Sequence, residues 1–122
     1  MPLTRNITEM SNEEIVRRYF KLIESQNLPD LVDMFDYDAV LKEPFSKMPE
    51  LKGRSEISAF LKVALMANSD MRRKLEVKSS DKTGKTRALV TFEKGDKLKG
   101  QFTFDIDPVT KKIRALKIEF LT

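Results

Sequence analysis

The chain has 122 residues, a net charge of +4 at pH 7, and neither cysteine nor histidine. The missing residue types exclude disulfides, thiol nucleophiles, Ser–His and Cys–His catalysis, and zinc sites that need thiolate or imidazole ligands. Acid–base chemistry must therefore use Asp, Glu, Lys, Tyr or Arg, and we expect no cofactor and no metal. We expect a single domain over residues 1–122, with 1–10 as a loose N-terminal arm, and a cytoplasmic location, because we find no signal-peptide pattern or membrane-spanning apolar run.

The N-terminal third of the sequence predicts two helices. Ser11 and Glu14 form a capping-box signature, and apolar residues then recur at helical spacing. This first helix should end near Gln26–Asn27. Pro29 suits the first turn of a second, short helix over residues 29–35.

A strand, a loop and a third helix are predicted next. Residues 37–44 favour a strand that Pro44 ends. Residues 46–53 are expected to form a loop, and Gly53 should open a helix over residues 54–68, where apolar residues again follow a helical period.

The remaining residues alternate between apolar and polar side chains, a period of two that predicts β-strands. Turn-forming segments, DKTGK, KGD and DPVTK, separate four such strands. The whole pattern predicts an α+β domain with helices on one face of an antiparallel sheet. On the other face Leu89 and Thr91 lie among charged residues, so this face is either solvated or covered by a second copy.

The order of these elements resembles the nuclear transport factor 2-like superfamily, and in particular its SnoaL-like and ketosteroid isomerase branch. The resemblance extends from about Ser11 to Phe120 and rests on three segments: RRYFKLIESQNLPDLVDMFDYDAVLKEP, KGRSEISAFL and FTFDIDPVTKKIRAL. It implies a cone-shaped fold, with the element order α-α-β-α-β-β-β-β and three N-terminal helices packed on a curved, mainly antiparallel sheet. It also implies a pocket for a small hydrophobic molecule and a homodimer formed through the sheet.

Glu43 is the first candidate site residue. In an extended strand it shares one face with Tyr37, Ala39 and Leu41, while Lys42 points the other way. By the resemblance, Glu43 matches the catalytic base of the ketosteroid isomerase branch, where the family residue is usually Asp. Desolvation in a pocket would raise the pKa of its carboxyl group toward the range useful for proton transfer. The alternative is a carboxylate at the rim of a cavity, in contact with water or an arginine.

By the resemblance, Tyr19 matches the tyrosine that donates a hydrogen bond to the substrate oxyanion in the isomerases. The alternative is a core tyrosine whose hydroxyl finds a backbone partner or water. The second donor of the isomerases is a protonated Asp, and the alignment places Gly100 there. This donor is therefore missing, which argues against ketosteroid isomerase activity itself. We interpret Gly100 as a bulge or bend in the sheet. The Asp-Arg-Asp set of the superfamily's epoxide hydrolases has no convincing counterpart.

Arg73 shares a strand face with Leu75 and Val77, so it could hold an anionic ligand or pair with Glu43, or else bend out into water. Seven apolar residues could line a cavity or simply fill it: Phe45, Phe60, Met66, Met71, Phe92, Phe102 and Phe104.

Three functional hypotheses follow from these residues. The first is a cofactor-independent isomerase or cyclase for a small hydrophobic carbonyl compound, in which Glu43 removes a proton α to the carbonyl and Tyr19 hydrogen-bonds the enolate oxygen. The second is a non-catalytic ligand-binding or dimerisation domain of the same fold. The third is a protein-interaction module that uses the sheet surface. Nucleic acid is not a favoured partner, because the lysines lie at turns and polar strand faces without aromatic platforms.

Overall fold

The computed structural model of the chain describes residues 9–44, 50–67, 72–80, 85–94 and 96–121. Within these residues the elements are α1 (Asn12–Glu24), α2 (Leu28–Asp33), β1 (Phe35–Lys42), β2 (Leu51–Lys52), α3 (Gly53–Ala67), β3 (Arg72–Ser80), β4 (Lys85–Lys94), β5 (Asp96–Ile106) and β6 (Ile113–Leu121). Most of the predicted N-terminal arm lies outside the described residues. None of the described helices is both long and apolar enough to cross a membrane.

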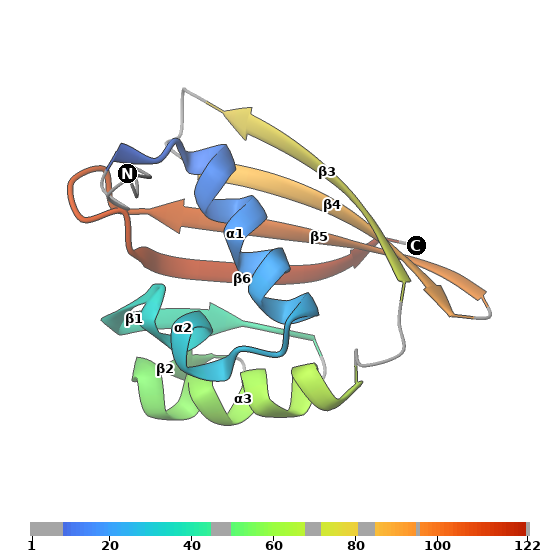
Figure 1. Cartoon of the computed structure of the whole chain (residues 1–122), viewed down its shortest axis with the longest axis horizontal. Coiled ribbons are helices and arrows are strands. Elements are labelled where there is room, and N and C mark those ends of the chain that lie inside the picture. Colours follow the sequence, from blue (N-terminus) through green and yellow to red (C-terminus); the bar gives the residue numbers. More distant parts are fainter. Residues whose placement is uncertain (1–8, 45–49, 68–71, 81–84, 95, 122) are drawn as a thin grey trace, which may run out of the picture.

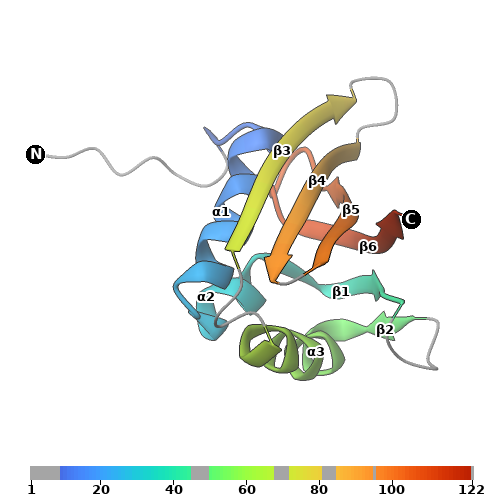
Figure 2. The same cartoon turned by 90° about the vertical axis from the view of Figure 1, so that its right-hand side faces the viewer.

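The strands form one sheet in the order β2-β1-β6-β5-β4-β3. β1 runs parallel to β6, and every other pair of neighbouring strands is antiparallel. α1 crosses the concave face of this sheet (Figure 1), and the sheet curves from β2 round to β3, with α3 beside its β1 and β2 end (Figure 2). The predicted α+β cone, with helices on one face of a curved and mainly antiparallel sheet, is confirmed.

The capping box at the start of α1 is present as predicted. The Glu14 backbone N–H donates to Ser11 Oγ at 3.2 Å, and the Ser11 N–H donates to Glu14 Oε1 at 3.1 Å. Both bonds satisfy backbone donors that a helix start otherwise leaves unpaired. The helix buries one broad apolar side against the sheet, made of Ile15, Val16, Tyr19, Phe20, Leu22 and Ile23.

The loop predicted over residues 46–53 is partly wrong. Leu51 and Lys52 form β2, whose residues pair with Leu41 and Val40 of β1. The element order therefore has one strand more than expected, between β1 and α3. A strand of two residues is too short to show an alternating pattern, so the sequence gives no periodic signal for it.

The predicted common face of β1 is wrong at Tyr37. Ala39, Leu41 and Glu43 are buried, but Tyr37 is 77% exposed. The register between β1 and β6 shifts between Phe35 and Val40, so the strand does not alternate regularly over these residues. Such an irregularity reverses side-chain direction locally.

Gly100 does not mark a bulge. It pairs with Val90 on β4 and with Phe120 on β6, and the register is regular on both sides of it. The register shift between β5 and β6 lies instead between Asp105 and Ile106. The interpretation of Gly100 as a bulge is therefore wrong, and the alternative of a bend in the sheet stays a prediction.

Candidate functional site

A hollow of about 70 Å³ lies between α1, α3 and the concave face of the sheet. It is lined by Tyr19, Phe20, Ile23, Phe60, Ala64, Arg73, Phe92, Phe102, Ile118 and Phe120. Eight of these ten residues are apolar. Pockets for drug-sized ligands measure roughly 300 to 1,000 Å³, so this hollow has room for a much smaller molecule.

Aromatic rings fill most of the space between α1 and the sheet. Tyr19 makes edge-to-face contacts with Phe20, at 5.0 Å between ring centroids, and with Phe104, at 5.3 Å. Phe20 makes a similar contact with Phe102 at 5.1 Å. Edge-to-face packing is favourable between aromatic side chains, and here it holds α1 firmly against β5. The hollow is the space that these rings leave open.

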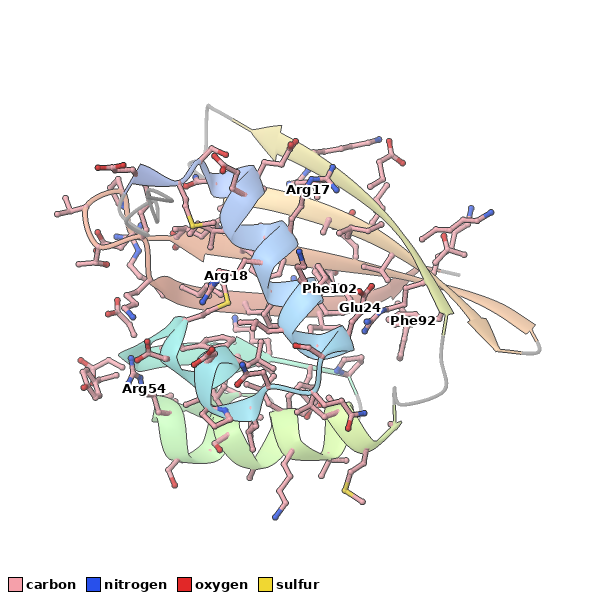
Figure 3. The ribbon with its side chains drawn as sticks, in the orientation of Figure 1. Arg17, Arg18, Glu24, Arg54, Phe92 and Phe102 are labelled. Carbon is pink, nitrogen blue, oxygen red and sulfur yellow. The ribbon has the colours of Figure 1, made fainter. Side chains whose placement is uncertain are left out.

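Arg73 is the charged residue among the described residues that line the hollow. It lies on β3 opposite Phe92, and its side chain is only 7% exposed. Its Nη2 atom lies 3.7 Å from Oε1 of Glu24, the last residue of α1, whose side chain is 66% exposed. Glu24, Phe92 and Phe102 lie close together near the C-terminal end of α1 (Figure 3). Burial lowers the pKa of Arg73, and Glu24 and Tyr19 partly oppose this effect.

Tyr19 is the other lining residue with a polar side-chain group. Burial raises the pKa of its phenol, and the positive charge of Arg73 lowers it only in part. The phenol therefore stays neutral near physiological pH and is able to donate a hydrogen bond. The hollow thus combines an apolar surface with two hydrogen-bond donors, an arrangement common in small-molecule sites.

No protein-family model and no curated protein matches this sequence. Solved structures do match. SalBIII, an epoxide hydrolase/cyclase-like enzyme in pyran ring formation in the polyether salinomycin, has a TM-score of 0.76 at 16% identity, with 91% of each chain covered. A SnoaL-like protein from Burkholderia thailandensis has a TM-score of 0.75 at 12% identity, covering 99% of this chain and 100% of the other. An NTF2-like protein from Cytophaga hutchinsonii has a TM-score of 0.67 at 10% identity, covering 93% and 92%.

This chain has the nuclear transport factor 2-like fold. The fold is the one that the sequence resemblance implied, and the SnoaL-like neighbour matches it over almost the whole chain. Identities this low show the fold and nothing about the reaction or the ligand, because this fold carries many unrelated functions.

Within this nuclear transport factor 2-like fold, five predicted site residues come together at the hollow: Tyr19, Phe60, Arg73, Phe92 and Phe102. Phe104 does not line it and is fully buried in the core. Met66 does not line it either. Its side chain is 73% exposed, because in the last turn of α3 the neighbouring Leu65 is the residue buried in the core. Phe45 and Met71 lie outside the described residues.

Glu43 lies beside the hollow but is not among its lining residues. It is 8% exposed and directly follows β1, where Leu41 pairs with Leu116 and Lys42 with Lys117. The next residue along β6 is Ile118, which lines the hollow. The inward direction expected for Glu43 therefore agrees with its burial, but the hollow that contains Tyr19 does not reach its carboxylate.

Sequence reasoning missed Glu24 and several apolar residues of the hollow. Phe20 and Ile23 carried only the signal of a buried helix side, which does not distinguish a cavity wall from solid core. Glu24 carried no signal, because its proximity to Arg73 arises from the packing of α1 near β3, far along the chain. Within the described residues, no group of three or more acidic side chains is placed so that it could hold a metal ion.

Proposed function

We propose that this chain binds a small, largely apolar molecule in the hollow between α1, α3 and the sheet. The supporting observation is the lining itself: eight apolar side chains with Tyr19 and Arg73 as polar groups. Tyr19 would donate a hydrogen bond to an oxygen of the ligand, and the surrounding rings would exclude water from its apolar part. The neighbours of the same fold include a cyclase-like enzyme, which is compatible with a small organic ligand.

Blocking the hollow tests this proposal. Ala64→Phe would place a ring in the hollow, whereas Val63→Phe adds a similar ring to the exposed side of the same helix. We would titrate both variants and the wild type with cyclohexanone and toluene and follow backbone amide shifts by NMR. Saturable shifts around the hollow in the wild type and in Val63→Phe, but not in Ala64→Phe, are expected. Non-saturable shifts in the wild type, or equal binding by Ala64→Phe, would overturn the proposal.

Enolisation of a carbonyl compound is the second candidate function, and the burial of Glu43 next to Ile118 favours it. Because the hollow does not reach the Glu43 carboxylate, the substrate would have to extend past Ile118. Glu43 would then take the proton α to the carbonyl, and the oxygen of the resulting enolate would accept a hydrogen bond from Tyr19. With a β,γ-unsaturated carbonyl compound, return of the proton at the γ carbon of the dienolate would give an isomer. Attack of the enolate on a second carbonyl of the same molecule would give a ring. No cofactor is needed for either outcome.

Exchange of the α-hydrogens of cyclohexanone for deuterium measures this step directly. Glu43→Gln should abolish the protein-dependent exchange, and Tyr19→Phe should slow it by about a hundredfold, as is typical for loss of one oxyanion donor. Glu13→Gln, on the exposed side of α1, is the control and should exchange at the wild-type rate. Exchange that persists in Glu43→Gln would remove this candidate and leave ligand binding.

The homodimer and the cytoplasmic location expected from the sequence remain proposals. The charges on the outer face of the sheet affect the homodimer. One row of paired residues across this face includes the exposed Lys42, Lys117, Arg87 and Lys78. Two copies packed face to face would bring such rows near each other, so we expect dimerisation to strengthen as salt screens the repulsion. Analytical ultracentrifugation at low and high salt would measure this, and a monomer under both conditions would exclude the dimer.

A further inference from the structure

We propose that the ligand of the hollow carries one carboxylate, or an equivalent singly charged acidic group, and that Arg73 binds this group in place of Glu24. This inference rests on the proposed binding function and names the class of molecule that the same hollow would take. It is argued from the unequal surroundings of the two members of the Arg73–Glu24 pair.

Within the part of the chain that the structure describes, Arg73 is a buried cation with an incomplete set of partners. A guanidinium has five N–H donors and stays charged in proteins, so it needs several acceptors when it is removed from water. The Arg73 side chain is almost fully buried, yet its contact with Glu24 is 3.7 Å long. Charge-assisted hydrogen bonds between a guanidinium and a carboxylate are about 2.7 to 2.9 Å long. Glu24 therefore compensates the buried charge of Arg73 but does not accept from all of the N–H donors of its guanidinium.

Glu24 is able to give up this contact when another carboxylate replaces it. Its side chain is mostly exposed at the end of α1, and water can solvate the carboxylate as soon as it turns away. Its departure alone would leave the buried charge of Arg73 unmatched, so Glu24 would leave as another acid takes its place. A carboxylate that arrives from within the hollow could instead approach the guanidinium with two parallel hydrogen bonds.

The lining decides what kind of acid would fit. Arg73 is the one cation among the ten lining residues that the structure describes, so a single negative charge is matched and a doubly charged phosphate is not. The remaining eight apolar residues require an apolar body, and the hollow of about 70 Å³ requires a short one. Tyr19 adds a neutral donor that can bind a carboxylate oxygen without a second charge. A short monocarboxylic acid meets all of these conditions.

Butanoate and butanamide are suitable probes, because they have nearly the same shape and differ in charge. Binding of each would be measured by NMR titration of amide shifts. The wild type should prefer butanoate by at least about tenfold, which is the ratio expected for one hydrogen-bonded charge. Arg73→Met should reduce this ratio to about one while butanamide still binds. Glu24→Gln should strengthen butanoate binding about two- to fivefold, since it removes a competing carboxylate, and leave butanamide unchanged.

The pair of Arg17 and Glu13 gives matched controls, because both are on α1 and their side chains are half exposed, 3.5 Å apart. Arg17→Met and Glu13→Gln should leave the butanoate-to-butanamide ratio as in the wild type. Arg73→Lys guards against misfolding of the Met variant: it keeps the charge without the planar fork and should retain part of the preference.

The outcomes separate this inference from the proposed function. Equal affinity of the wild type for both probes, or a preference that survives in Arg73→Met, overturns the inference and leaves binding in the hollow intact. Weaker butanoate binding in Glu24→Gln also overturns it, because Glu24 would then support the ligand rather than compete with it. Binding of neither probe at saturating concentration, together with no binding of cyclohexanone or toluene, overturns both.

Discussion

Arg54 lies over the ring of Tyr37, with its guanidinium carbon 4.1 Å from the ring centroid. The same guanidinium donates from Nε to the Phe35 carbonyl at 2.9 Å and from Nη2 to the Asp33 carbonyl at 3.4 Å. Arg54 therefore connects the start of α3 with the end of α2 and the irregular part of β1. Figure 3 shows it at the left-hand side of the molecule, away from Glu24 and Phe92.

Arg54→Ala should lower the free energy of unfolding by about 1 to 3 kcal/mol, because it removes hydrogen bonds from a charged donor to two carbonyls. Tyr37→Ala should cost less, about 0.5 to 1 kcal/mol, since it removes only an exposed cation–π contact. Urea unfolding of the two variants measures both values. Arg17→Ala, which breaks an exposed i,i+4 pair, is the control and should cost about 0.5 kcal/mol or less. An Arg54→Ala variant as stable as Arg17→Ala would show that the connection has no effect on stability.

The turn between β5 and β6 should lose stability in acid. The backbone N–H groups of Thr110 and Val109 hold the pKa of Asp107 below its ordinary value of 3.8, and Arg114 adds to the effect. A lowered pKa in the folded state means that the ionised carboxylate stabilises the fold above this ordinary value, and that the gain disappears as the pH falls through the lower, folded-state pKa. The wild type should therefore have a higher melting temperature than Asp107→Asn at neutral pH, and the two melting temperatures should converge in strong acid. A difference that is independent of pH would contradict this account.

Lys111 occupies a left-handed backbone conformation, with φ of 60°. A side chain there costs about 1 kcal/mol or more relative to glycine. Lys111→Gly should consequently be more stable than Lys111→Ala by about 1 kcal/mol in thermal or urea unfolding. Both variants lose the same hydrogen bond from Lys111 Nζ to Asn12 Oδ1, which is 3.3 Å long, so the comparison isolates the backbone. Equal stability would mean that the turn relaxes in the alanine variant.

Gly100 should tolerate alanine but not valine. A Cβ atom at this position would lie 3.4 Å from ring carbons of Phe92 and of Phe102, which is ordinary contact. Gly100→Ala should therefore change the free energy of unfolding by no more than about 1 kcal/mol. Gly100→Val would push the two rings into the hollow and should cost about 1 to 3 kcal/mol, with weaker binding of cyclohexanone. Urea unfolding and the NMR titration above check both effects, and a valine variant that behaves like alanine would mean that the rings move freely.

The sequence predicted the elements whose signals are local. The Ser11–Glu14 box and the helical period of α1 depend only on neighbouring residues, and both are present. β2 was not predicted, because a strand of only two residues shows no alternating pattern. Tyr37 was assigned to the wrong face because an irregular strand does not keep a period of two.

The candidate site was predictable only in part, since a cavity depends on how distant elements pack. Phe60, Phe92 and Phe102 were identified by size and spacing, and all three line the hollow. The same criteria also selected Met66, which lies on the exposed side of α3. Glu24 could not be found at all, because the strand that carries its partner Arg73 follows it only after two further helices and two strands.

The position of β6 between β1 and β5 determines when the fold can be completed. β6 is the strand that joins the β1–β2 part of the sheet to the β3–β5 meander, yet it follows all the other described elements along the chain. Until β6 is in place, both parts of the sheet have an open edge. Because β1 and β6 are far apart in sequence, closing this pair is expected to be the slow step of folding, and it joins both parts of the sheet in a single event.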